Sequence, residues 1–217
     1  MQLLGDAGWP FWVVWLYHFI GVILTDVAFL GSYINPAFVV ATLAIGGLSR
    51  TEAAVRLFAE LVAAFFGFRL MNHFIAPSFS DPTLAAKLTG PGFDQKAGIL
   101  RPALAEGVLT ALFAVAIALN MKLVPKSRPW LRRAVPAAAL RVCMQAGATI
   151  SGGCMNPLVA LSWLAESSSL SNYATRLDYL LVYVVAPIVG GVVGFISVST
   201  CDTLLSSKPI KARSRSK

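Results

Sequence analysis

Charged side chains are scarce in this chain of 217 residues, where Asp, Glu, Lys and Arg together make up only 13%. Soluble domains usually carry roughly 25% charged residues. Hydrophobic residues reach 57% here, and the mean hydropathy is +0.71. This deficit of charge excludes an ordinary soluble domain and favours a protein that faces lipid. No long polar stretch remains to build a second domain, so residues 1–217 are interpreted as one membrane domain.

Histidine and cysteine are also few, which limits the chemistry that the chain can perform. The two histidines, His18 and His73, and the three cysteines show no metal-ligand spacing. We find no nucleophile–base pair, phosphate loop or metal cluster, so the sequence predicts no enzyme, no cofactor and no metal site. An intramembrane enzyme that uses Ser151 or Cys154 with a histidine is the weaker alternative, because nothing places either histidine beside them.

Acidic residues number 10 against 18 basic ones, which gives a net charge of +8. A basic balance can indicate nucleic acid, but these basic residues lie in short loops and at the C-terminus, beside apolar runs. Segments 46–56, 122–133 and 202–217 hold 12 of the 18. The positive-inside rule places these segments in the cytoplasm and the N-terminus on the opposite side. Membrane topology therefore explains the charge, and no nucleic-acid partner is predicted.

Long hydrophobic runs are abundant. A helix needs roughly 20 residues to cross a hydrocarbon core of about 30 Å. Five stretches meet this length, at residues 9–30, 52–71, 101–121, 130–150 and 179–200. Small residues at four-residue spacing predict close helix packing in lipid. They occur at Ala59, Ala63 and Gly67 in the second stretch and at Gly190 and Gly194 in the fifth.

Two further apolar runs are too short to span and are predicted to be half-helices, at residues 36–45 and 157–166. Such pieces are tolerated in a membrane only when they are buried in protein or line a wet cavity. Each follows a predicted span and opens with Asn-Pro, at Asn35-Pro36-Ala37 and at Asn156-Pro157-Leu158. Asn is a favoured N-cap, and Pro is favoured at the first helical position.

The repeated motif indicates a channel. One Asn-Pro is only a turn signal, but two broken helices in corresponding positions point to a site at the membrane midplane. Half-helices entering from opposite faces would bring their N-termini together. Their partial positive charges would repel cations while a neutral dipole such as water passes.

These features resemble the aquaporin (major intrinsic protein) superfamily over nearly the whole chain. The first motif matches the family's Asn-Pro-Ala, and the second departs from it at Leu158. The stretches 154–163 and 183–187 are similar to the small basic intrinsic proteins, an unorthodox branch. The resemblance implies an all-α inverted repeat with five full spans and two half-helices. Its parts would be an incomplete first repeat (1–71), a loop (72–100), a second repeat (101–200) and a basic tail (201–217).

The resemblance also implies a pore within each subunit of a homotetramer, passing water and small neutral solutes such as glycerol or urea. Its outer filter would consist of Trp15, Met144, Gly153 and Val159. Water-selective members have Arg in place of Val159 and commonly His in place of Met144, so strict water selectivity is not expected. Trp15 is equally well interpreted as an interfacial anchor. The alternative function is a non-conducting or truncated relative with the same fold.

Four ionisable residues fall inside predicted spans, where charge is expensive and usually functional or paired. They are Asp26, Glu60, Glu106 and Arg141. Glu106 resembles the family glutamate that holds the backbone of the second half-helix loop, and Arg141 is a candidate partner for it. Cys154, two residues before Asn156, is expected at the pore mouth, where a mercurial could reach it.

One predicted span precedes Asn35, whereas two precede Asn156. The internal repeat therefore predicts that the family's first span and its supporting glutamate are missing. Either the sequence begins late, which we favour, or the protein is a genuine five-span relative, and this form is expected to conduct poorly. The segment Arg213-Ser214-Arg215 is similar to an endoplasmic-reticulum retention signal, and a plain basic tail is the alternative. An intracellular membrane is thus an expectation, with the plasma membrane also open.

Overall fold

All regular structure in the described part of the chain is helical. The computed structural model describes residues 10–28, 34–74, 91–94, 96, 98–166 and 173–206. The shorter helices are α2 (Phe11–Ala28), α3 (Pro36–Ala44), α4 (Arg50–Phe74), α6 (Leu100–Leu123), α7 (Pro129–Gly147) and α8 (Pro157–Glu166). A continuous C-terminal helix follows, made of α9 (Tyr173–Leu180), the π-helical turn η4 (Leu181–Val185) and α10 (Ala186–Ser206). The all-α class is therefore confirmed.

Helices occupy all five predicted spans and both predicted half-helices. By length and composition, α2, α6 and the segment Leu177–Cys201 can cross a membrane. The remaining two, α4 with 25 residues and α7 with 19, are long enough but more charged. Three predicted spans differ by three residues or more at an end. The helix α4 runs on to Phe74, α7 ends at Gly147, and the C-terminal helix extends from Tyr173 to Ser206. The Arg213–Arg215 segment and most of the 72–100 loop lie outside the described residues.

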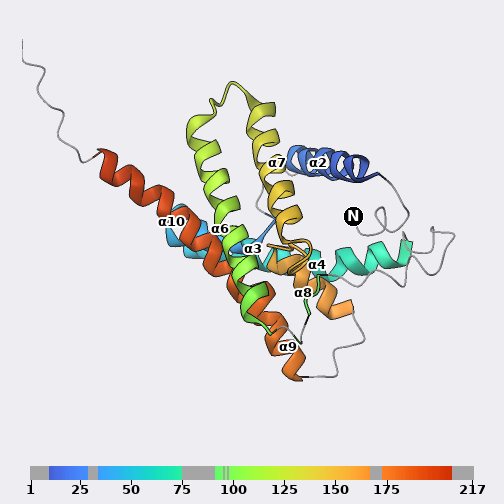
Figure 1. The fold of residues 1–217 in the computed structure, drawn as a ribbon. Coiled ribbons are helices and arrows are strands. Elements are labelled where there is room, and N and C mark those ends of the chain that lie inside the picture. The colour runs from blue at the N-terminus through green and yellow to red at the C-terminus, as the bar shows by residue number, and fades with distance from the viewer. Residues whose placement is uncertain are drawn as a thin grey trace, which may run out of the picture.

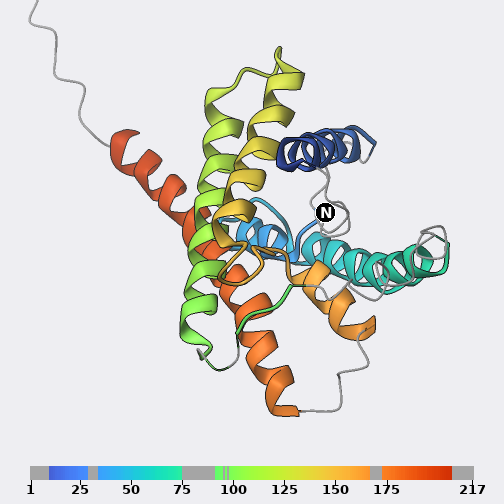
Figure 2. The ribbon, with the colours of Figure 1, turned by 45° about the vertical axis from the view of Figure 1, so that its right-hand side comes forward.

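The helices pack as two crossed halves. Figures 1 and 2 show α6, α7 and α10 packed together, with α2 and α4 extending from one side and α3 and α8 between them. The helix that follows each motif packs against the half-helix of the other motif, α4 against α8 and α10 against α3. Further contacts join α6 to α7 and α2 to α7. This exchange of partners brings the two Asn-Pro motifs to the centre of the fold.

Glycines allow α10 to approach its neighbours closely. A Cβ on Gly194 would lie 2.5 Å from the Ala111 carbonyl oxygen of α6, and one on Gly190 would collide with Gly107. The close packing predicted for Gly190 and Gly194 is therefore confirmed. The same prediction for α4 is wrong within the described residues. Ala59 and Ala63 are exposed, and a Cβ on Gly67 would meet nothing within 4 Å.

The turn η4 is explained by Pro187. Proline has no N–H, and in an α-helix its ring would clash with the carbonyl four residues earlier, here that of Tyr183. The helix widens instead, and the N–H of Ala186 donates to the carbonyl of Leu181, five residues back. The widened turn contains Tyr183, which is fully buried and faces the second motif.

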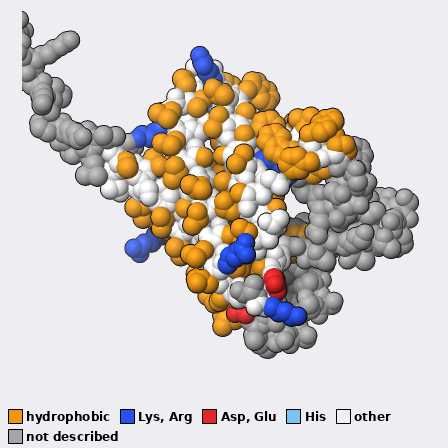
Figure 3. All heavy atoms as spheres, in the orientation of Figure 1, with side chains coloured by type: hydrophobic (Ala, Val, Ile, Leu, Met, Phe, Trp, Pro, Cys, Tyr) orange, Lys and Arg blue, Asp and Glu red, His pale blue; other side chains and the backbone are white. Residues whose placement is uncertain are grey.

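Apolar side chains fill the centre and also cover the surface. An aromatic group from three helices forms the core, with the rings of Phe38 and Phe113 at 5.1 Å and those of Phe38 and Phe195 at 6.0 Å between centroids. Figure 3 shows hydrophobic side chains over most of the face in view. Large apolar residues such as Leu112 and Val189 are more than half exposed. This surface suits lipid as its solvent.

The contrast between two glycines gives a stability prediction. Gly190→Ala should lower the free energy of unfolding by about 1–3 kcal/mol, because the added methyl collides with the Gly107 backbone. Gly67→Ala is the matched control on α4, where the space is open and the higher helix propensity of Ala is expected to dominate. Thermal unfolding of both variants in detergent measures the difference, and equal melting temperatures would contradict the close packing.

Candidate pore site at the two Asn-Pro motifs

Each half-helix is capped by its own asparagine. Asn35 has an extended backbone, with φ −148° and ψ 112°, and its Oδ1 accepts a hydrogen bond from the Ala37 N–H at 3.0 Å. Asn156 repeats this contact, since its Oδ1 accepts from the Leu158 N–H at 3.0 Å. Pro36 and Pro157 begin the helices, as predicted. The caps satisfy one of the unpaired N–H groups at each helix start.

The two asparagines also bind each other's loops. Asn35 Nδ2 donates to the Met155 carbonyl at 2.9 Å, and Asn156 Nδ2 donates to the Ile34 carbonyl at 3.0 Å. Each side-chain amide has two hydrogens, so one on each side remains for another acceptor. Asn35 is buried, whereas Asn156 is half-buried and therefore more accessible. The motifs thus meet through reciprocal hydrogen bonds between the two repeats.

The loop before Asn156 has an unusual backbone. Gly152 and Gly153 have φ values of 82° and 61°, which explains the need for glycine at both positions. Met155 also has a positive φ of 50°, although it is not glycine and is fully buried. Such conformations persist only where the surroundings enforce them. The Met155 N–H is bound by Glu106 and its carbonyl by Asn35, and these two bonds hold the residue in place.

Glu106 of α6 holds this loop through three hydrogen bonds. Its carboxylate accepts from the Ser151 hydroxyl at 2.7 Å, the Cys154 N–H at 2.9 Å and the Met155 N–H at 2.6 Å. The side chain is fully buried, so these donors replace its hydration. Glu106 thus binds three groups of the loop that precedes Asn156.

The pair of Glu106 with Arg141 is not formed. The carboxylate is engaged by the loop, and the Arg141 Cζ lies 5.8 Å from the centre of the Phe11 ring instead. In the described part of the chain, the Arg141 Nε has no hydrogen-bond partner. Asp26, another of the four ionisable residues in the predicted spans, pairs with Arg133 at 2.9 Å and so links α2 to α7.

Two further residues of the network were missed from the sequence. Tyr183 donates to the Ser151 carbonyl at 2.6 Å, and so supports the loop from the side of η4. The hydroxyl of Ser151, a candidate nucleophile by sequence, instead donates a hydrogen bond to Glu106. The signal that could have found Tyr183 is a tyrosine in an aliphatic run, because a buried tyrosine hydroxyl needs a partner.

The structure brings together some of the predicted filter residues. Gly153 packs directly on the backbone of Met144, and a Cβ at Gly153 would collide with it. Val159 is half-buried in the first turn of α8. Trp15 stacks on Phe19 of its own helix at 5.3 Å between ring centroids. The Sγ of Cys154 lies 3.4 Å from the Asn156 carbonyl, so this thiol adjoins the second motif.

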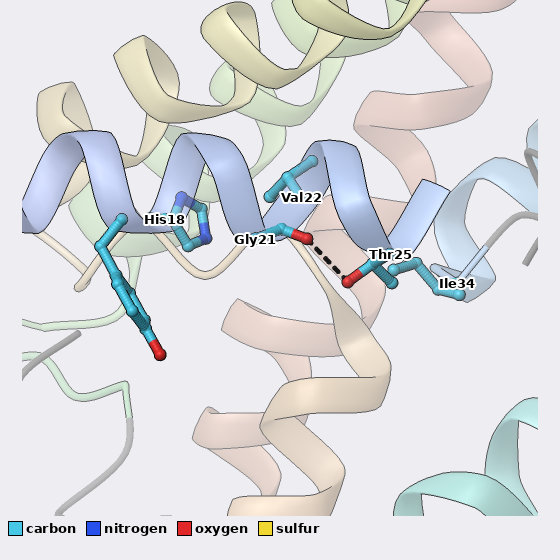
Figure 4. Close-up of a pocket in the computed structure, with 6 residues that line it drawn as sticks. His18, Gly21, Val22, Thr25 and Ile34 are labelled. Atoms are coloured by element: carbon cyan, nitrogen blue, oxygen red, sulfur yellow. Dashed lines mark hydrogen bonds between the residues drawn. The ribbon is translucent and has the colours of Figure 1, made fainter. Parts of the chain in front are cut away.

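A cavity of about 340 Å³ lies along α2 and reaches the loop of the first motif. Figure 4 shows the α2 residues His18, Gly21, Val22 and Thr25 beside it, with Ile34 at its far end. Tyr17 completes the lining. The Thr25 hydroxyl is engaged with the Gly21 carbonyl at 2.8 Å, as Figure 4 shows. Since Ile34 also accepts from Asn156, the cavity ends where the two motifs meet.

Removal of the Glu106 carboxylate should destabilise the protein strongly. In Glu106→Ala the N–H groups of Cys154 and Met155 lose a charged acceptor, and breaking such a buried group typically costs about 3–5 kcal/mol. Glu52→Ala is the matched control, because that glutamate forms an exposed pair with Arg56 and should cost less than about 1 kcal/mol. Thermal unfolding in detergent compares the two. Similar losses would contradict the supporting role.

Comparisons with known proteins agree with this geometry. No family model matches the chain. It is 28% identical to Aquaporin-11 of Rattus norvegicus over 192 residues, which cover 88% of this chain and 68% of that protein. The fold matches the X-ray structure of the aquaglyceroporin from Plasmodium falciparum with a TM-score of 0.61 and 22% identity, over 88% of this chain and 81% of that one. These likenesses support membership of the aquaporin superfamily.

Proposed function

We propose that the protein is a passive membrane channel for water and small neutral solutes such as glycerol or urea. The observation that carries the proposal is the reciprocal contact of the two half-helix caps, in which Asn35 binds the Met155 carbonyl and Asn156 binds the Ile34 carbonyl. The likeness to an aquaporin and to an aquaglyceroporin supports a channel for water or small solutes. Those relatives are channels rather than enzymes, and we propose the same here.

The proposed exclusion of cations follows from the helix starts. An α-helix carries about half a positive charge at its N-terminus. The two caps place the N-termini of α3 and α8 close together, with α3 and α8 in contact. Two such ends, in an environment of low dielectric constant, repel hydronium and metal cations and leave neutral solutes unaffected. The second amide hydrogen on Asn156 can bind the oxygen of a passing solute.

The choice of solute depends on the outer filter, which we propose to be Trp15, Met144, Gly153 and Val159. Met144 and Val159 supply neither a hydrogen-bond donor nor a positive charge. A filter without these groups discriminates weakly between water and slightly larger neutral molecules. We therefore propose permeation by glycerol or urea besides water. The resemblance to the small basic intrinsic proteins stays a prediction.

The assembly and the membrane are also proposals. We propose a homotetramer with one pore in each subunit, in line with the resemblance described above. The apolar helices suit an integral membrane protein. An intracellular membrane, such as the endoplasmic reticulum, is the proposed location, with the plasma membrane as the alternative.

Swelling of proteoliposomes tests the function. Purified protein is reconstituted at a known density, and light scattering follows osmotic swelling with water, glycerol and urea. Faster swelling than in protein-free vesicles, with no rise in proton leak, is expected of a neutral-solute channel. Flux equal to that of empty vesicles for all three solutes would favour the non-conducting relative.

Val159→Arg should lower the flux of glycerol and urea. A guanidinium at this position narrows the filter and adds fixed donors, so larger solutes lose access before water does. The matched control is Val159→Leu, which adds bulk without charge. Swelling rates are compared at equal abundance of the three proteins. Unchanged glycerol and urea flux in the arginine variant would exclude Val159 from the filter.

A mercurial should inhibit the flux by binding Cys154, whose sulfur lies 3.4 Å from the Asn156 carbonyl. A bulky adduct at this position blocks the route beside the second motif. Cys154→Ser should relieve most of the inhibition, and Cys143→Ser should relieve none because that thiol is buried in the core. If only Cys143→Ser relieved the mercurial inhibition, the solute would not pass beside Cys154.

A further inference from the structure

Glu60 of α4 is a buried carboxylate that has no role in the pore proposed above. Its side chain lies within the fold, with the residue only 7% exposed. Neither carboxylate oxygen has a hydrogen-bond partner among the described residues. Burial of such a group without a donor is costly, whether the group is charged or neutral. The position therefore calls for a donor that satisfies the carboxylate.

A candidate donor is the backbone N–H of Asn35, which caps the half-helix α3 that packs against α4. Asn35 is also 7% exposed, so both groups are enclosed in the same part of the fold. The helix α4 packs against α3, which Asn35 caps, and against α8. Arg56, one turn earlier, is bound to Glu52 at 2.9 Å on the exposed side of the helix. The first motif thus has a carboxylate at its start.

The second motif shows what such a group can do. Its loop is held from two sides, by Glu106 of α6 and by Tyr183 of the helix that follows α8. Glu60 lies on α4, the helix that follows α3. In the first repeat, α4 corresponds to the helix that carries Tyr183 in the second. Within the described residues, Glu60 and Glu106 are the two buried glutamates, and each adjoins one motif.

We propose that Glu60 is a positioning residue for the first motif, where its carboxylate accepts the backbone N–H of Asn35. This bond would fix the Asn35 side chain in the orientation that reaches the Met155 carbonyl at 2.9 Å. The effect on solute flux rests on the proposed function. The effect on loop geometry does not, because the Asn35–Met155 bond exists whether or not the pore conducts.

Loss of the Glu60 carboxylate should therefore loosen the loop that precedes Asn156. Met155 follows Cys154 directly, and its carbonyl is the acceptor for Asn35. When Asn35 is released, Met155 loses one of the two bonds that hold its strained backbone. The adjacent Cys154 thiol then becomes easier to reach. The reactivity of Cys154, in the second repeat, therefore measures the effect of Glu60, in the first repeat.

The experiment compares Glu60→Gln, which keeps an acceptor oxygen, with Glu60→Met, which keeps the length but removes the acceptor. Glu60→Leu serves as a second variant without an acceptor if the methionine form accumulates poorly. Glu52→Met is the control on the exposed face of the same helix. Modification of each cysteine by a maleimide is followed by mass spectrometry in the full-length protein, and the exposed Cys201 is the internal reference.

We expect Glu60→Met to raise the modification rate of Cys154 about tenfold, as for the loss of one hydrogen bond, with Cys201 unchanged. Glu60→Gln should stay near the wild-type rate. Equal Cys154 rates in the wild type and Glu60→Met, or equal acceleration in Glu60→Gln and Glu60→Met, would overturn the inference.

Swelling of vesicles with the same proteins separates this inference from the proposed function. Lower flux in Glu60→Met, restored in Glu60→Gln, supports both. A wild type that does not conduct, with the expected pattern at Cys154, overturns the channel and leaves the positioning role in place. Wild-type flux with an unchanged Cys154 rate in Glu60→Met overturns only the positioning role.

Discussion

Backbone groups that start a helix inside a membrane must be paired within the protein, because hydrocarbon offers no partner. This constraint shapes the region around the two motifs. In the loop before α8, backbone N–H groups donate hydrogen bonds to Glu106. The carbonyl of Met155, whose backbone is strained, accepts a hydrogen bond from Asn35. The glycines of this loop allow its left-handed backbone, and Gly190 and Gly194 allow the close approach of α10 to α6. The two motifs are thus held together by a few satisfied amides.

The supports of the two motifs differ in kind. The second loop rests on a carboxylate with three donors and on a tyrosine hydroxyl, both fully buried. The first loop has Glu60 beside it and the amide of Asn156 across from it. In a channel, selectivity depends on the charged groups and dipoles that line the pore. The denser network around Asn156 suits the motif whose side chain is more accessible.

The sequence was most informative where structure is locally determined. Asn and Pro define a helix start by their own chemistry, so the starts of α3 and α8 and the contacts of both caps could be predicted. The family resemblance, rather than local chemistry, indicated Glu106 as the residue that holds the second loop. The spacing of small residues was a less reliable signal. Ala59, Ala63 and Gly67 make a helix face on which another helix could pack closely, but the spacing does not determine whether a helix packs there. The role of Tyr183 and the left-handed Met155 depend on contacts between distant segments, which local patterns do not encode.

The reciprocal bonds between the motifs also set an order of events during synthesis. Asn35 and its acceptor Met155 are 120 residues apart, and Asn156 and Ile34 are 122 apart. At roughly 5–20 residues per second, the ribosome needs on the order of 6–24 s to make the intervening chain. Throughout this interval the first half-helix has no counterpart to bind. The hydrogen bonds of Asn35 and Ile34 with the second loop can therefore form only after that loop has been synthesised.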